Sequence, residues 1–192
     1  MPPLCAPALA AALAALSPSL SAQGPGGRPG DGYDFGGGYV EGSGSGRALI
    51  GLGAFNAFNR DNPDVDVKND EASFEARAEY QWGRKWYGLG PAVGFLGNFD
   101  GGLYGYGGVY LDFVPTPGWV VTPLAGAGAY SRGDSKELGG TFQFILQLDV
   151  AREFRNASRL GLRLTHISSA GINDPNPGVN SLLVTWSIPF DF

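Results

Sequence analysis

The sequence predicts an all-β protein, an eight-stranded antiparallel up-and-down transmembrane β-barrel. Three observations predict this fold. Segments of strand length alternate apolar and polar residues, and no helical period competes with them. Their apolar faces extend over whole segments, long enough for a tilted strand of about 9–12 residues to cross a membrane. The connections between segments alternate long and short, as in outer-membrane barrels, whose periplasmic turns are short and whose outer loops are longer.

Residues 1–22 have the pattern of a secretory signal peptide. The stretch "ALAAALAAL" is an apolar core of suitable length, and "SLSAQG" offers small residues for cleavage after Ser21 or Ala22. The stretch before the core carries no Lys or Arg, which is unusual for a signal peptide, and a short membrane anchor is the alternative. The apolar run is too short for a spanning helix and Pro18 interrupts it, so we expect export and cleavage.

Two further regions follow the predicted signal peptide. Residues 23–47 form a Gly/Pro-rich leader that we expect to be partly flexible, and its stretch "YDFGGGYV" either packs on the domain or moves with the leader. Residues 48–192 are expected to form the barrel. The predicted strands cover residues 48–58, 71–82, 86–96, 103–113, 119–130, 141–154, 158–169 and 181–192.

The alternation assigns one face of each strand to lipid and the other to the barrel interior. In "TFQFILQLDVAREF" (141–154), Phe and Leu residues share one face and Gln, Asp and Glu share the other. Eight strands enclose an interior that side chains can just fill, so we expect a packed polar interior and no conducting pore. The residues expected in it are Glu75, Arg77, Glu79, Gln143, Gln147, Asp149, Arg159 and Arg163.

Aromatic residues are frequent at the predicted strand ends, as in the interfacial girdles of membrane barrels. They are Tyr80, Trp82, Trp86, Tyr87, Trp119, Tyr130, Phe190 and Phe192. The aromatic terminus Phe192 is also similar to the assembly signal of such barrels. A soluble exported barrel holding an apolar ligand would alternate as well, with its apolar face inward, and it is the alternative to a membrane barrel.

The composition excludes several classes of function. The net charge of −5 argues against nucleic acid, which selects basic patches. The only cysteine, Cys5, lies in the predicted signal peptide, so no disulfide or thiolate metal site is expected. We see no metal-ligand cluster and expect no cofactor. The glycines of "GGLYGYGG" (101–108) alternate with tyrosines inside a predicted strand, which favours close side-chain packing over a phosphate-binding loop.

The only histidine, His166, stands two residues before Ser168 on a predicted strand. Both share the parity of a leucine stripe that must face lipid if the arginines face the interior, so we expect both to project outward. Asn180 has the same parity on the returning strand, and the hairpin would bring it beside them. An imidazole next to a hydroxyl can activate a serine nucleophile. The alternative is an ordinary polar rim, where the cost of a polar residue is about 0–1 kcal/mol.

The stretch "HISSAGINDPNPGVNS", followed by "LLVTWSIPF", resembles the C-terminal region of the lipid A 3-O-deacylases, the PagL-type outer-membrane acyl hydrolases. The close resemblance covers residues 160–190, and the rest of the chain is similar only in strand plan, size and export signal. The resemblance implies an eight-stranded barrel with an outward-facing Ser-His-Glu triad. It also implies hydrolysis of the ester-linked acyl chain at the lipid A 3 position, without a metal or an organic cofactor.

Carried over by residue, the resemblance makes His166 the base and Ser168 the nucleophile. The glutamate of the family's triad falls on Asn180, whose amide can orient the imidazole but cannot supply a negative charge. The asparagine that helps to hold the oxyanion in the family falls on Ser169. We expect Ser169, or backbone N–H groups near Gly171, to serve as the oxyanion donor.

One further residue of the loop bears on the triad. Asp174 is either a replacement carboxylate or a turn residue before Pro175. The expected function is that of an outer-membrane esterase removing an ester-linked acyl chain from lipid A or a related glycolipid. Its partner would be lipid A or another outer-leaflet lipid. The alternative function is a catalytically weak or inactive barrel with a structural or lipid-binding role.

Overall fold

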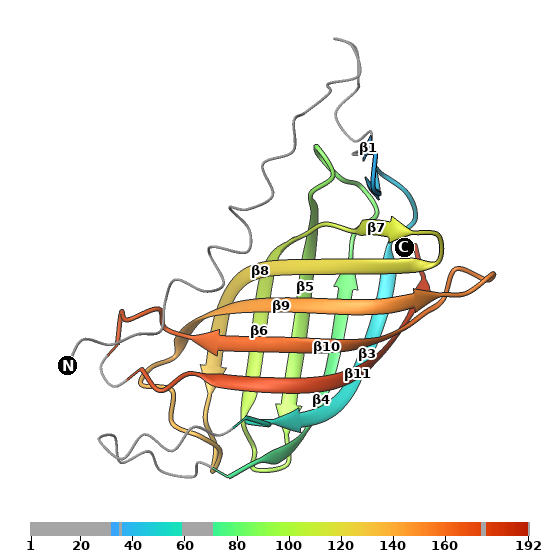
Figure 1. The fold of residues 1–192 in the computed structure, drawn as a ribbon. Helices are drawn as coiled ribbons and strands as arrows, with labels where there is room; N and C mark the ends of the chain where they lie inside the picture. Colours follow the sequence, from blue (N-terminus) through green and yellow to red (C-terminus); the bar gives the residue numbers. More distant parts are fainter. Residues whose placement is uncertain (1–31, 35, 59–70, 174–175, 192) are drawn as a thin grey trace.

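The computed structural model describes residues 32–34, 36–58, 71–173 and 176–191, and eight long antiparallel strands close into a barrel (Figure 1). The strands are β3 (Arg47–Phe55), β4 (Ser73–Gln81), β5 (Gly90–Asn98), β6 (Leu103–Tyr110), β8 (Trp119–Ser131), β9 (Phe142–Glu153), β10 (Arg159–Ser168) and β11 (Val179–Pro189). Pairing of β11 with β3 closes the sheet. The predicted eight-stranded up-and-down barrel is therefore confirmed. The predicted signal peptide, Asp174 and Phe192 lie outside the described residues.

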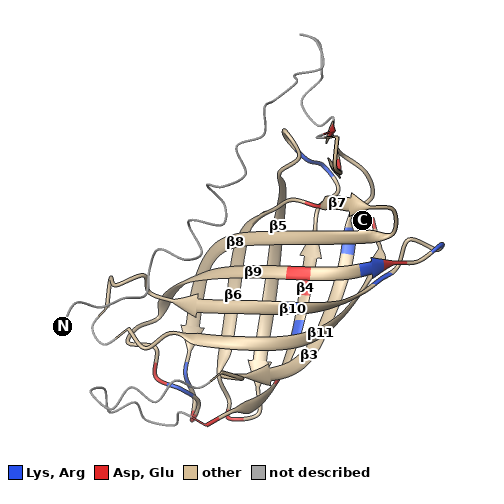
Figure 2. Ribbon diagram, viewed as in Figure 1, with Lys and Arg blue, Asp and Glu red and all other residues tan. Residues whose placement is uncertain are grey.

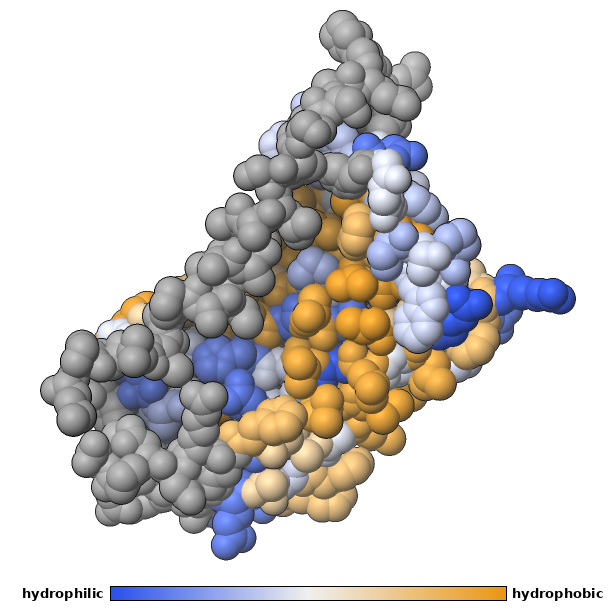
Figure 3. Space-filling model, in the orientation of Figure 1, coloured by the Kyte–Doolittle hydropathy of each residue, from blue (hydrophilic) through white to orange (hydrophobic). Residues whose placement is uncertain are grey.

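The outer wall of the barrel is apolar. Ile50, Leu162 and Val184 keep 58%, 59% and 54% of their surface exposed, far more than such side chains would in water-soluble proteins. Figure 3 shows apolar side chains gathered on the wall in this view. Exposed apolar residues alternate with buried residues along the strands, and on β4, β9, β10 and β11 most of the buried ones are polar or charged. This is the pattern of a membrane barrel with lipid outside. Among the described residues, no helix is long and apolar enough to cross a membrane.

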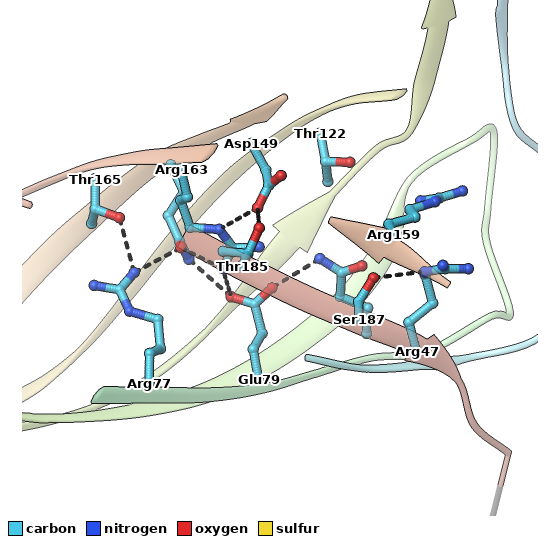
Figure 4. Close-up of polar contacts among 12 residues, drawn as sticks. Arg47, Arg77, Glu79, Thr122, Asp149, Arg159, Arg163, Thr165, Thr185 and Ser187 are labelled. Carbon is cyan, nitrogen blue, oxygen red and sulfur yellow. Dashed lines mark hydrogen bonds and ion pairs between the residues drawn. The ribbon is translucent and has the colours of Figure 1, made fainter. Parts of the chain in front are cut away.

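The charged residues predicted for the barrel interior are paired with opposite charges. All of the residues predicted for it are buried. Arg163 is only 2% exposed, and it donates from Nε to Asp149 Oδ2 and from Nη1 to Glu79 Oε2, each at 2.9 Å (Figure 4). Figure 2 shows Lys, Arg, Asp and Glu at only a few positions along the strands. Glu79 and Asp149 each form an ion pair with Arg163. Buried charges need such partners, because an isolated ion loses its hydration without compensation.

Tyrosines from β6 fill the remaining space. Tyr104, Tyr106 and Tyr110 are each at most 5% exposed. A Cβ on Gly94 would lie 2.3 Å from the Tyr106 ring, so this position has room only for glycine. Tyr130, which we expected in the outer girdle, also faces inward at 5% exposure and donates to the Lys136 carbonyl. That prediction was wrong because Tyr130 pairs across the ladder with the inward-facing Tyr104.

Strand boundaries differ from the prediction at two connections. β5 begins at Gly90 and not at residue 86, because Tyr87 and Gly88 have φ of 50° and 77° and form a tight turn. Residues predicted as the connection 114–118 contain β7 (Phe113–Thr116), which forms a hairpin with β8 through Gly118 at φ 79°.

The described part of the leader, residues 32–34 and 36–46, lies at the barrel mouth where β11 ends (Figure 1). Within the stretch "YDFGGGYV", β1 (Tyr33–Asp34) pairs with β2 (Tyr39–Val40), and β2 pairs with β7. Glu41 accepts a hydrogen bond from Arg159 Nη2 at 2.9 Å. A cavity of about 640 Å³ remains between this segment and the mouth. This part of the leader therefore packs on the domain.

A second ion-pair cluster lies at that mouth. Asp112 accepts from Lys85 Nζ at 2.9 Å and from Thr122 Oγ1 at 2.6 Å, and it lies 3.1 Å from Arg159 Nη1. Burial of Asp112 favours its neutral form, but the charges of Arg159 and Lys85 outweigh this effect and lower the pKa of the carboxyl. The cluster thus ties the β6–β7 connection to β10 and to the turn after β4.

The interior pairing leads to a stability prediction. Arg163→Met leaves Glu79 and Asp149 buried without their shared cation, so we expect the free energy of unfolding to fall by about 3–5 kcal/mol. Urea unfolding in lipid vesicles, followed by tryptophan fluorescence, measures the change. Leu162→Met on the outer face of the same strand is the control, with an expected change of about 1 kcal/mol or less. Equal losses in the two variants would contradict the assigned role of Arg163.

Candidate active site

His166, Ser168 and Asn180 lie together at the outer ends of β10 and β11, away from the mouth where the described part of the leader lies. His166 and Asn180 are direct partners in the β10–β11 ladder, and Ser168 follows two residues after His166. All three are half-buried, whereas Leu162 and Leu164, on the same face below them, are 59% and 49% exposed. The group therefore sits where the apolar wall ends.

Hydrogen bonds connect the three side chains. His166 Nδ1 lies 2.9 Å from Asn180 Oδ1, and His166 Nε2 lies 3.1 Å from Ser168 Oγ. A carbonyl oxygen can only accept, so the Asn180 contact places the proton of the neutral imidazole on Nδ1. Nε2 is then left as an acceptor for the Ser168 hydroxyl. A base in this tautomer can remove a proton from the serine.

The strand periodicity explains why these residues meet. Successive side chains on β10 alternate between faces, so His166 and Ser168 share the outer one. The chain leaves the strand directly afterwards, because Ala170 and Gly171 have φ of 52° and 83°. The loop returns so that Asn180 pairs with His166, 14 residues later in the chain.

Ser169, the predicted oxyanion donor, has the opposite parity and is fully buried at 0% exposure. Its hydroxyl accepts from the Asn173 backbone N–H at 3.3 Å, and its own N–H donates to Asn176 Oδ1 at 3.0 Å. These bonds fasten the loop that follows Ser168. The structure thus places Ser169 in the loop scaffold and does not bring its hydroxyl to the His166–Ser168 pair. Asp174 lies outside the described residues.

Gly178 is a contributor that the sequence reasoning missed. Its φ is 61°, and a Cβ on it would lie 3.1 Å from Cε1 of His166 and 3.5 Å from Cβ of Ser168. The loop backbone therefore closes against the imidazole ring, and a side chain here would press on it. The signal for this role was present in "NPGVNS", where a glycine stands just before a strand.

The surroundings of the site are apolar on the side of β9. Ser168 is paired with Phe144 and His166 with Leu146, both of which are exposed on the outer wall. The rings of Phe142 and Phe144 contact edge to face, with their centroids 5.1 Å apart. Within the described part of the chain, no group of three or more His, Cys, Asp or Glu could hold a metal ion. The arrangement suits nucleophilic attack on an ester that lies at a lipid boundary.

Three comparisons relate the chain to known proteins. A family model described as "Lipid A 3-O-deacylase (PagL)" matches residues 71–189. A lipid A deacylase PagL of Pseudomonas aeruginosa is 28% identical over 127 residues, which cover 57% of this chain and 73% of that protein. A lipid A deacylase PagL of Bordetella bronchiseptica is 36% identical over 55 residues, 29% of this chain and only 31% of that protein, so the match spans less than a third of its length.

Among solved structures, a crystal structure of the outer membrane enzyme PagL matches with a TM-score of 0.56 at 20% identity. The match covers 75% of this chain and 99% of that chain. At 20% identity it shows a shared fold and nothing about activity. The family model, however, extends over residues 71–189 of 192, which is more than half of the chain. The chain therefore belongs to the PagL family of lipid A 3-O-deacylases.

Proposed function

We propose that this protein is an outer-membrane esterase that removes an ester-linked acyl chain from lipid A, with Ser168 as the nucleophile and His166 as the base. One observation carries the proposal: the side chains of Asn180, His166 and Ser168 form a continuous hydrogen-bonded series, at 2.9 and 3.1 Å, on the lipid-facing wall. Membership of the PagL family supports lipid A as the substrate.

The geometry is compatible with a two-step acyl transfer. Ser168 Oγ attacks the ester carbonyl carbon while His166 Nε2 takes the hydroxyl proton across the 3.1 Å contact. The tetrahedral intermediate then breaks its bond to the sugar oxygen, which receives that proton from Nε2 as the alcohol leaves. Water, activated by the same nitrogen, attacks the acyl-Ser168 ester. The products are a free fatty acid and the regenerated hydroxyl.

Asn180 takes the place of the family's carboxylate and has a narrower role. Its Oδ1 holds Nδ1–H of His166, so the imidazole keeps the tautomer that the reaction needs. It does not stabilise the imidazolium that forms in the transition state, as a negative charge would. In a serine protease, Asp→Asn costs about 10⁴ in kcat, and much of that loss is tautomeric. We therefore propose an active but slow enzyme.

The position of the site supports a membrane lipid as the substrate. Phe144 and Leu146 flank Ser168 and His166 on the wall, so an acyl chain in contact with these residues would bring its ester to the polar rim. A polar group there meets water and headgroups, and its cost of exposure is about 0–1 kcal/mol.

A second candidate function is a barrel of the same family without useful activity, with a structural or lipid-binding role. The amide at position 180 favours it, because the charge that a triad normally supplies is missing. The two candidates differ in whether fatty acid is released, and they are separated by the measurements below.

The nucleophile is tested by Ser168→Ala. Purified, folded protein is mixed with lipopolysaccharide, and released 3-hydroxy fatty acid is measured by mass spectrometry. We expect wild-type protein to release it and Ser168→Ala to be slower by at least about 10³-fold, because the attacking oxygen is gone.

Ser131→Ala is the matched control, since Ser131 is an exposed serine at the outer end of β8 and takes no part in the site. Release at the wild-type rate is expected from it. Equal release by Ser168→Ala and wild type would reject the mechanism, and no release by wild type would favour the inactive barrel.

The role of Asn180 is tested by two substitutions of opposite effect. Asn180→Glu adds the carboxylate of the family pattern, and we expect kcat to rise by roughly 10-fold to 10³-fold because the imidazolium gains a counter-charge. Asn180→Leu keeps the size but removes the acceptor, and kcat should fall by about 10²-fold or more. Initial rates at saturating lipid measure both effects. Wild-type activity in Asn180→Leu would show that the His166–Asn180 contact is irrelevant to the reaction.

A further inference from the structure

The wall of the barrel carries a second set of polar residues directly behind the proposed site. Thr165 and Ser181 are partners in the β10–β11 ladder, one step below the His166–Asn180 pair. Because side chains alternate, Thr165 and Ser181 face the lumen, where they are 3% and 1% exposed. The two pairs therefore stand on opposite sides of one short stretch of ladder.

Both luminal hydroxyls are bound by a single ion pair from β4. Arg77 Nη1 lies 2.9 Å from Thr165 Oγ1, and Ser181 Oγ donates to Glu75 Oε2 at 2.7 Å. Arg77 and Glu75 are joined to each other by Nε and Nη2 of the guanidinium, at 2.9 and 2.5 Å from Glu75 Oε1. Figure 4 shows Arg77, from β4, directed at Thr165 of β10.

The ion pair lies on β4, and its hydrogen bonds reach strands that are not neighbours of β4 in the sheet. β4 is separated from β11 by β3, and β10 lies one strand further. Arg77 Nη1 also lies 2.8 Å from Gln147 Oε1 of β9. One buried arginine–glutamate pair thus holds three strands, β9, β10 and β11, at the height of the proposed site. Hydrogen bonds to charged groups in a buried setting are stronger than neutral ones and fix geometry tightly.

We propose that the Glu75–Arg77 pair, acting through Ser181 and Thr165, positions His166 and Asn180 for the reaction. The inference rests on the proposed function and adds positioning residues inside the barrel to a site on its outside. Positioning by the luminal residues is important here because Asn180 is neutral. Its amide does not attract the His166 imidazolium as a carboxylate would. The orientation of the ring then depends on where the ladder places the two strands.

The test removes the two hydroxyls and leaves the charges in place, because an unpaired buried charge would endanger folding. Thr165→Val and Ser181→Ala are made singly and together. Thr122→Val is the matched control: Thr122 is a buried luminal threonine whose hydroxyl donates to Asp112 at 2.6 Å, at the other end of the barrel. Thr165→Ser restores the hydroxyl. The folded fraction of each variant is taken from the heat-dependent gel mobility of the barrel.

For the double variant we expect kcat per folded protein to fall about tenfold with an unchanged KM, since small displacements of a catalytic group can cost up to about 10²-fold. Thr122→Val should stay within about twofold of wild type, and Thr165→Ser should recover the rate of the single variant. A double variant with wild-type kcat would overturn the proposal, as would an equal loss in Thr122→Val.

A second readout does not need activity. His166 is the only histidine of the chain, so ¹⁵N-histidine labelling gives NMR signals from one imidazole. We expect the Nδ1–H signal to shift and broaden in the double variant and to stay unchanged in Thr122→Val. An unchanged signal would overturn the proposal. Failure of the proposed function is seen separately, as activity that survives in Ser168→Ala.

Discussion

A sheet in hydrocarbon must pair every backbone N–H and C=O group, and all other features of this protein depend on that constraint. An unpaired group there costs several kcal/mol, so the sheet closes on itself through β3 and β11. Closure with eight strands leaves a lumen that side chains fill. Charged side chains in the filled lumen are removed from water, so each needs an opposite charge beside it. Arg163 accordingly lies between Glu79 and Asp149.

The function proposed above uses the outer wall, because side chains fill the lumen. The wall is apolar along most of its height, and polar side chains become inexpensive only near its rim. The outer ends of β10 and β11 use this zone, because the ladder sets His166 opposite Asn180 and the strand period sets Ser168 on the same face. Three residues from one hairpin thus meet without any contribution from a distant loop. The closing turn at Gly178 completes the surroundings of the ring.

The luminal and lipid-facing sides of the wall are coupled, because neighbouring residues of one strand face opposite sides. His166 and Thr165 are adjacent on β10, and Asn180 and Ser181 are adjacent on β11, so any force on the luminal pair reaches the outer pair through a single peptide unit. The interior network therefore does more than fill space at this height. In the proposal made above, the Glu75–Arg77 pair contributes both to stability and to the site, whereas at the opposite mouth Arg159 joins Asp112 to Glu41 of the leader.

The sequence by itself determined the strand number, the face of nearly every residue, and the meeting of His166, Ser168 and Asn180, because these follow from a period of two and from one short hairpin. It misassigned Tyr130, whose position at a strand end resembled a girdle residue. Only the tertiary structure decided which charges pair across the lumen, how Ser169 is held by its loop, and that the leader packs at one mouth. The charge pairs and the leader contacts join segments far apart in the chain, and their partners are selected by register and closure, which local periodicity does not encode. The contacts of Ser169 are local, but they depend on the path of an irregular loop, which periodicity does not encode either.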